Sequence, residues 1–180
     1  MIESTFILLK GIGEPTERRL WQCGVQDWQA FLACRSLQGI STERKRAYDV
    51  DIASAVRHLR DRQSRFFGKC LRPRDHWRLY EAFKSRAVYL DIETTGGTPE
   101  HGEVTVVGLY GTGRMISLVR GESLTDERLN QELSQYDLVV TFFGSVFDLP
   151  FLRAKYPAWC SINLTSTCAS RLGALDGEEA

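Results

Sequence analysis

The sequence predicts a mixed α/β domain that follows a small helical segment. In the first half, apolar residues recur at helical spacing, whereas the second half alternates short apolar runs with polar helical stretches. The charge changes at the same point: residues 1–87 carry 17 Lys and Arg against 10 Asp and Glu, and residues 88–180 carry 6 against 13. We therefore expect a helical segment over residues 1–86. A mixed sheet over residues 87–180 should open with antiparallel strands and continue with parallel crossovers.

Start and stop signals predict four helices in the first half. Pro15 stands at a first turn and Gly24 ends that helix, while Ser41 can cap a longer one. The sequence Phe66-Phe67-Gly68 is expected to break the long helix. The predicted helices span residues 15–24, 25–33, 41–65 and 73–84. The apolar positions of the long helix are Ala47, Val50, Ala53, Ala55 and Leu59.

From residue 87 onward, the pattern changes to that of strands. A Gly-Thr-Gly turn at 111–113 joins two strands into a hairpin. The predicted strands span residues 87–93, 104–110, 115–120, 138–143 and 161–164. Helices are predicted over residues 124–136 and 149–155, and a short one after the fifth strand.

Composition excludes several classes of protein. With 43% hydrophobic residues the chain can bury a core, and no apolar run reaches the roughly 18 residues of a membrane span. The five cysteines form no Cys-x-x-Cys pair, which argues against a zinc site or a disulfide framework and favours a reducing cytoplasm. A basic first half suits a polyanion and an acidic second half suits metal ions; alternatively, the two halves attract each other.

Carboxylates gather near the ends of two predicted strands. Asp91 and Glu93, in the sequence VYLDIETTGG, are two residues apart, so both point to one face of a strand, and Asp148 follows the fourth strand. If the first and fourth strands are parallel neighbours, the three acids meet at one edge of the sheet. Such a group is unfavourable unless a cation neutralises it, and carboxylates suit Mg²⁺ or Mn²⁺. The alternative is an Asp-x-Glu pair on a wet strand face with no function.

Two stretches resemble the first and second motifs of DEDD exonucleases, which have a ribonuclease H-like fold: residues 90–96 (LDIETTG) and 140–152 (VTFFGSVFDLPFL). Within that superfamily the chain resembles proteins with a YprB-type ribonuclease H-like domain, also at residues 77–83 and 88–90. The resemblance implies metal-dependent removal of nucleotides from the 3′ end of single-stranded or 3′-ended DNA or RNA. It implies Asp91, Glu93 and Asp148 as ligands of Mg²⁺ or Mn²⁺, with Thr94 and Phe147 beside them.

The chain departs from that family in its last part. The family uses a fourth acid with Tyr or His four or five residues before it, whereas Asp176 is preceded there by Leu172 and Arg171. The frequent Asn of the second motif is Phe143 here. We therefore expect a truncated domain, or one that a second chain completes, with impaired hydrolysis. The alternative is a non-catalytic nucleic-acid-binding module on a degenerate nuclease scaffold.

The chain resembles a helix-hairpin-helix loop at residues 9–17 (LKGIGEPTE). Glycines there let a phosphate approach backbone N–H groups at the start of a helix, while the isoleucine anchors the turn in the core. The alternative is a plain tight turn, since Glu14 and Glu17 would repel phosphate. The candidate nucleic-acid-binding residues are Lys10, Gly11, Ile12, Gly13 and, beside the acids, Thr94.

Overall fold

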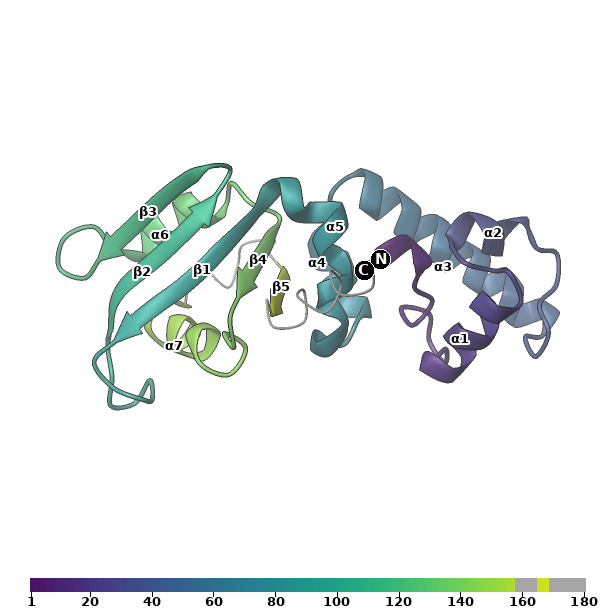
Figure 1. Ribbon diagram of the computed structural model, residues 1–180, viewed down its shortest axis with the longest axis horizontal. Coiled ribbons are helices and arrows are strands. Elements are labelled where there is room, and N and C mark those ends of the chain that lie inside the picture. Colours follow the sequence, from purple (N-terminus) through teal and green to yellow (C-terminus); the bar gives the residue numbers. More distant parts are fainter. Residues whose placement is uncertain (158–164, 169–180) are drawn as a thin grey trace, which may run out of the picture.

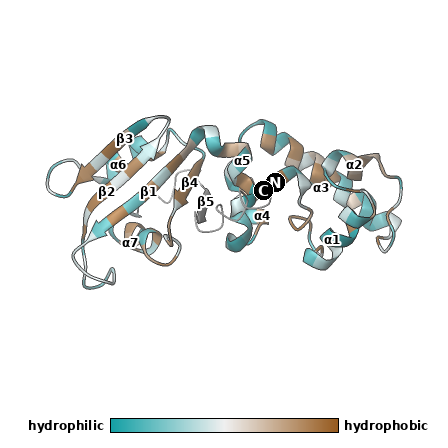
Figure 2. Cartoon of the chain, viewed as in Figure 1, coloured by the Kyte–Doolittle hydropathy of each residue, from teal (hydrophilic) through white to brown (hydrophobic). Residues whose placement is uncertain are grey.

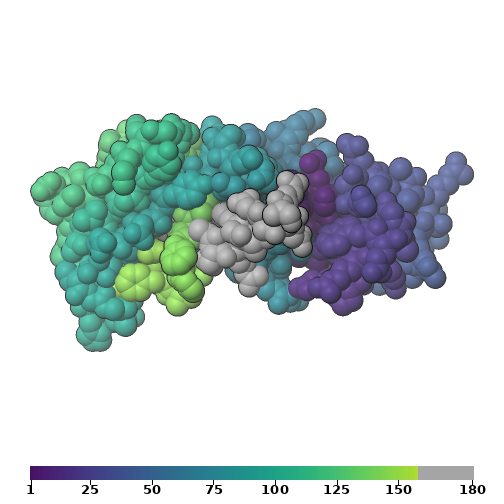
Figure 3. Space-filling view, viewed as in Figure 1, coloured from purple at the N-terminus to yellow at the C-terminus, as the bar shows by residue number. Residues whose placement is uncertain are grey.

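A computed structural model of the chain describes residues 1–157 and the backbone of residues 165–168. The N-terminal helices form one end of an elongated molecule, and a five-stranded mixed sheet forms the other end (Figures 1 and 3). This arrangement confirms the predicted fold class. No helix in the described part of the chain is long and apolar enough to cross a membrane.

Residues 1–86 fold into short helices around one long helix. The α-helices are α1 (Glu14–Gln22), α2 (Trp28–Ala33), α3 (Thr42–Arg60), α4 (Ser64–Cys70) and α5 (Tyr80–Phe83). Short 3₁₀ helices span Ile2–Ser4, Pro73–Leu79 and Lys84–Arg86. The side chains of Asp27 and Ser41 cap α2 and α3, as expected for these residue types before a helix.

Three expectations for this half are wrong. Helix α3 ends at Arg60, and Phe66-Phe67-Gly68 lies inside α4 rather than at a break. Val50, expected on the buried side of α3, is 68% exposed, because the side that packs inward carries Tyr48, Ile52 and Ala55. The helix expected over residues 73–84 is 3₁₀ for most of its length.

The sheet has the strand order β3-β2-β1-β4-β5. Its strands are β1 (Ala87–Thr94), β2 (Val104–Gly111), β3 (Arg114–Val119), β4 (Leu138–Thr141) and β5 (Thr165–Cys168). Strands β1, β2 and β3 are antiparallel, whereas β1, β4 and β5 are parallel. Helices α6 (Asp126–Leu133) and α7 (Asp148–Lys155) flank β4 in the chain. The strand predicted at 161–164, and the helix after the fifth strand, lie outside the described residues.

The two faces of the sheet belong to two different hydrophobic cores. Val88, Leu90 and Ile92 of β1 pack with residues of α6 and α7 on one face. On the other face, Leu138 and Val140 join the core of the N-terminal helices. Figure 2 shows hydrophobic segments in the strands and in the N-terminal helices. On this second face, β1 and β2 carry exposed side chains, so the N-terminal helices cover only part of it.

Charged residues also join the two halves. Asp137, just before β4, forms ion pairs with Arg62 at 2.7 Å and Arg86 at 3.3 Å. Two of the arginines that make the first half basic therefore form ion pairs with an acid of the second half.

Candidate active site

The two acids of β1 lie on the partly open face of the sheet. Strand β1 alternates buried and exposed residues, and Asp91 and Glu93 are both exposed. Asp91 stands opposite Gly108 and Glu93 opposite Val106 on β2. Beyond Glu93 the register shifts at a bulge, which ends the regular pairing. Both carboxylates are therefore accessible from one side, as their spacing predicts.

Asp148 is the first residue of α7, and a tight loop carries the chain there from β4. The expectation that β1 and β4 are parallel neighbours is confirmed, so their C-terminal ends face the same way. Gly144 lies in the loop where a side chain has no room. A Cβ atom there would lie 2.3 Å from Thr141 Cβ and 2.5 Å from Asp148 Oδ2. The sequence analysis did not single out Gly144. A glycine just after an apolar strand is nevertheless a signal that another part of the chain comes close to the backbone there.

Asp148 differs from every other buried acid in the described residues. Three of these acids have an arginine partner: Glu17 with Arg78, Asp75 with Arg74, and Glu132 with Arg114 and Arg128. Asp148 is only 3% exposed, and among the described residues it has no ion pair and its Oδ2 atom has no hydrogen-bond partner. A buried carboxylate without a partner is unfavourable. A positive charge beside Asp148 would stabilise it, and no described neighbour supplies one.

Electrostatics links Asp148 to Asp91. Burial raises the pKa of the Asp148 carboxyl to about 6, and repulsion by the Asp91 carboxylate adds to that rise. The two acids are therefore close enough to interact. A bound divalent cation would favour the ionised form of Asp148 against both causes of the raised pKa, so this pair fits a metal site.

The three predicted ligands are not gathered into a finished metal site. Among the described residues, no group of three His, Cys, Asp or Glu side chains is placed to hold a metal ion. The electrostatic link joins Asp148 to Asp91, and Glu93 has no part in it. The expectation that all three acids meet at one edge is therefore supported for two of them.

The other residues expected at the site lie around it. Thr94 donates a hydrogen bond from Oγ1 to the Gly96 carbonyl, which ties down the loop after β1. Phe147 is 37% exposed and packs its ring 5.0 Å from that of Phe151. His101, which the sequence places in the loop between β1 and β2, is exposed, with Nδ1 lying 3.3 Å from the Thr98 hydroxyl.

The glycine turn of the N-terminal segment has only one of its two expected helices. Helix α1 follows it with Gly13 as N-cap, but a three-residue 3₁₀ helix and turns precede it. Gly11 has a φ of 89°, and Ile12 is buried as expected, while Lys10 is exposed. The acids expected to repel phosphate are both engaged with arginines: Glu14 with Arg18 and Arg74, and buried Glu17 with Arg78.

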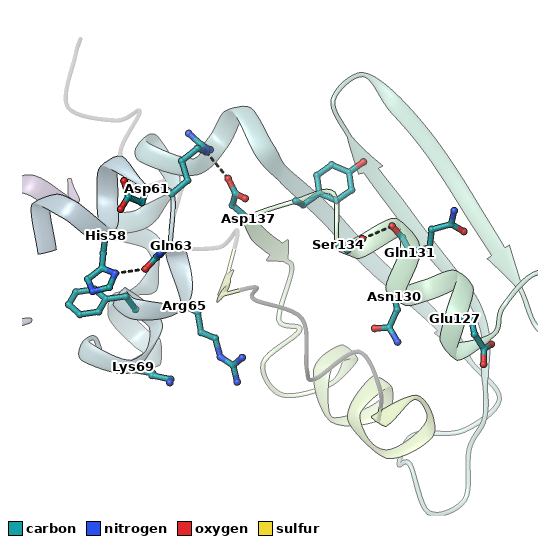
Figure 4. Close-up of a pocket in the computed structure, with 13 residues that line it drawn as sticks. His58, Asp61, Gln63, Arg65, Lys69, Glu127, Asn130, Gln131, Ser134 and Asp137 are labelled. Carbon is teal, nitrogen blue, oxygen red and sulfur yellow. Dashed lines mark hydrogen bonds and ion pairs between the residues drawn. The ribbon is translucent and has the colours of Figure 1, made fainter. Parts of the chain in front are cut away.

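A large groove of about 960 Å³ lies elsewhere, between α3–α4 and α6. Figure 4 shows Arg65 and Lys69 on one wall and Asn130 and Gln131 on the other. Asp137 lines it just before β4 begins, whereas Asp148 follows the end of β4. The groove is therefore at the opposite end of the strand from the acids.

Among the comparisons with known proteins, the family match agrees with this fold. Residues 88–171, just under half of the chain, match a family model described as RNase H superfamily. No curated protein sequence matches the chain. NrnC of Brucella melitensis is 22% identical with a TM-score of 0.38, and NrnC of the same organism bound to pGG is 23% identical with a TM-score of 0.38. Each match covers 56% of this chain and 50% of the other, so this chain matches only about half the length of these proteins. The family match indicates that residues 88–171 resemble an RNase H superfamily domain.

Proposed function

We propose that this protein is a metal-dependent 3′→5′ exonuclease of the DEDD type that acts on single-stranded or 3′-ended DNA or RNA. Asp91, Glu93 and Asp148 would hold Mg²⁺ or Mn²⁺. The observation that supports this most directly is Asp148: among the buried acids of the described residues it is the one without an arginine. Its Oδ2 atom is buried and unpaired beside a second carboxylate, as expected for a cation ligand.

The chain's own residues would bind the cation and admit the substrate. Exposed Asp91 and Glu93 can be reached by a phosphodiester from the open face of the sheet. The loop around Gly144 holds Asp148 in place, because a larger residue at position 144 would collide with its carboxylate. A bound divalent cation would supply charge neutralisation and an activated water molecule for hydrolysis.

Several finer features belong to the same proposal. Residues 1–86 would be a helical appendage and residues 87–180 an exonuclease domain that resembles the YprB type. A second chain would contribute a fourth carboxylate, and without it hydrolysis would be impaired. A cytoplasmic location would suit a sequence whose five cysteines form no Cys-x-x-Cys pair.

The test is degradation of a 5′-labelled single strand in Mn²⁺. The wild type should shorten it from the 3′ end, and Asp91→Ala and Asp148→Asn should abolish the shortening. Asp51→Ala, on the exposed side of α3, is the matched control and should leave it unchanged. Mn²⁺ should also raise the melting temperature of the wild type but not that of Asp148→Asn. Shortening that persists in both site variants would exclude this site.

The second candidate is a non-catalytic nucleic-acid-binding module. The observation that favours it is a hollow of about 430 Å³ at the start of α1, which Gly13, Arg72 and Arg74 line. Phosphate contacts there would make binding salt-sensitive and independent of sequence. Lys10→Ala and Arg72→Ala should then weaken binding in EDTA, whereas Asp91→Ala should not. Binding that these two substitutions leave unchanged would reject this hollow as the binding surface, and no binding in EDTA would reject this candidate.

A further inference from the structure

Helix α3 has one apolar surface that no other described part of the chain covers. Its inner side packs in the core of the N-terminal helices. On its outer side, Val50 is 68% exposed and stands between Ala47 and Ala53, which are exposed as well. The three residues follow one another at intervals of three, so they form one patch around Val50, here called the α3 patch. The exposed side of a helix usually carries charged and polar residues, so the fold of the single chain does not explain this patch.

Opposite charges flank the α3 patch at its two ends. Glu43 lies seven residues before Val50 and Arg57 lies seven residues after it, so all three follow one line along the helix. Glu43 and Arg57 are exposed, and neither forms an ion pair or a side-chain hydrogen bond with another described residue. On the same helix, by contrast, Lys45 is paired with Asp49 at 2.6 Å. The line therefore has an acid at one end, an apolar centre and a base at the other end.

We propose that the α3 patch packs against the same patch of a second copy of the chain. The two helices would run antiparallel about a two-fold axis at Val50. Such an interface is self-complementary, because each residue before the axis meets the residue equally far after it in the other copy. Glu43 would then face Arg57 of the second copy, and the reverse pair would form across the axis. Ala47 would face Ala53 of the second copy, and these small side chains let two helices pack closely at a shallow angle.

The pattern of charge favours a second copy over other occupants. A polyanion would be repelled by Glu43, whereas a second α3 supplies an opposite charge at both ends of the line. The contact between two such helices lies at the small end of specific interfaces, below roughly 1,200 Å² in total, so the pairing should be reversible. Unfolding measured at low micromolar concentration would therefore report on the single chain.

This inference does not depend on the proposed nuclease activity. Helix α3 belongs to the N-terminal end of the elongated molecule, whereas Asp91 and Glu93 belong to the sheet at the other end (Figure 1). Pairing through the α3 patch can therefore be measured in the absence of metal and of nucleic acid. Failure of one proposal leaves the other unchanged.

The test is sedimentation velocity in EDTA over a wide range of protein concentration. The wild type should pass from monomer to dimer as concentration rises, and Val50→Asp should stay monomeric because it places two carboxylates at the axis. Glu43→Arg and Arg57→Glu should each raise the dissociation constant roughly tenfold, because each turns two attractions into two repulsions. The two reversals combined in one chain restore opposite charges and should return the constant close to that of the wild type.

Glu122→Arg is the matched control, because it makes the same change of charge at an exposed acid in the loop after β3. It should leave the dimer unchanged, and circular dichroism should show that every variant keeps its helices. A wild type that is monomeric at every concentration would overturn the inference. A dimer that survives Val50→Asp and both single reversals would place the interface elsewhere. Single reversals that weaken the dimer without recovery in the double variant would contradict the antiparallel arrangement.

Discussion

At the scale of single residues, the ionisation of Asp148 should set a pH dependence of stability. Its pKa is about 6 in the folded protein, against roughly 4 in an unfolded chain. Between these values the unfolded state has lost the proton that the folded state keeps. In EDTA, this residue's contribution to the free energy of unfolding should therefore fall as pH rises from about 4 to about 6, and stay level above.

The measurement is urea unfolding of the wild type and of Asp148→Asn across that pH range. The two curves should diverge by on the order of 2 kcal/mol, with the wild type losing relative stability as pH rises. Other carboxyls titrate in the same range, but they are shared by both proteins and cancel in the difference. Parallel curves would mean that Asp148 ionises without penalty and would remove the main support for the cation site.

Phe143 offers a second prediction, because its backbone is strained. Its φ is 54°, in the left-handed region that side chains other than Asn rarely adopt, and its ring is 59% exposed. Phe143→Asn should stabilise the protein by about 0.5–1 kcal/mol in urea unfolding. Phe143→Ala keeps the strained backbone and should give no such gain. An equal loss in both variants would instead show that the ring, 4.9 Å from that of Phe142, matters more than the backbone.

The candidate site could be predicted only in part at this scale. A period of two places Asp91 and Glu93 on one face, and the same period places Tyr89 beside them. The burial of Asp148 could not be predicted, because it depends on how the irregular loop from β4 brings Thr141 and Gly144 against it.

At the scale of elements, the prediction succeeds where periodicity is strong and fails where distant contacts decide. Strands β1, β2 and β3 lie within two residues of their predicted bounds. The end of α3 at Arg60 could not be predicted from the residues around it in the sequence. Arg62, just beyond it, has a φ of 54° and forms an ion pair with Asp137, which is 75 residues away in the chain. Such a contact overrides the local helical pattern that continues to Arg65.

Glu17 is the residue that joins α1 to the segments around it, which gives a third prediction. It accepts hydrogen bonds at 2.5 Å from the Thr5 hydroxyl and the Phe6 N–H, and pairs with Arg78 at 3.2 Å. Glu17→Ala would leave these buried donors unpaired, so it should cost roughly 3–5 kcal/mol in urea unfolding. Glu14→Ala removes a half-buried acid one turn earlier, whose ion pairs are with more exposed arginines, and should cost less than about 1 kcal/mol. Similar losses for the two variants would contradict this role.

At the scale of the whole molecule, the change in charge and pattern near residue 87 suggests two units, yet a hydrophobic core crosses that boundary. Leu138 and Val140 of β4 are buried with Phe67 and Phe83 of the N-terminal helices. Asp137 adds ion pairs to both Arg62 and Arg86 across the same boundary. Neither half can keep these groups covered without the other, so we expect the two halves to unfold together.

The last prediction tests this shared core. In a Trp159→Phe background, Trp21, Trp28 and Trp77 report on the N-terminal helices by fluorescence, while far-UV circular dichroism follows the whole chain. The two signals should give one coincident urea transition. Leu138→Ala, in the sheet, should shift both by the same amount, about 2–5 kcal/mol, because Leu138 is fully buried against those helices. Val50→Ala should shift neither by more than about 0.5 kcal/mol. A fluorescence transition that Leu138→Ala leaves in place would mean that the helices unfold independently of the sheet.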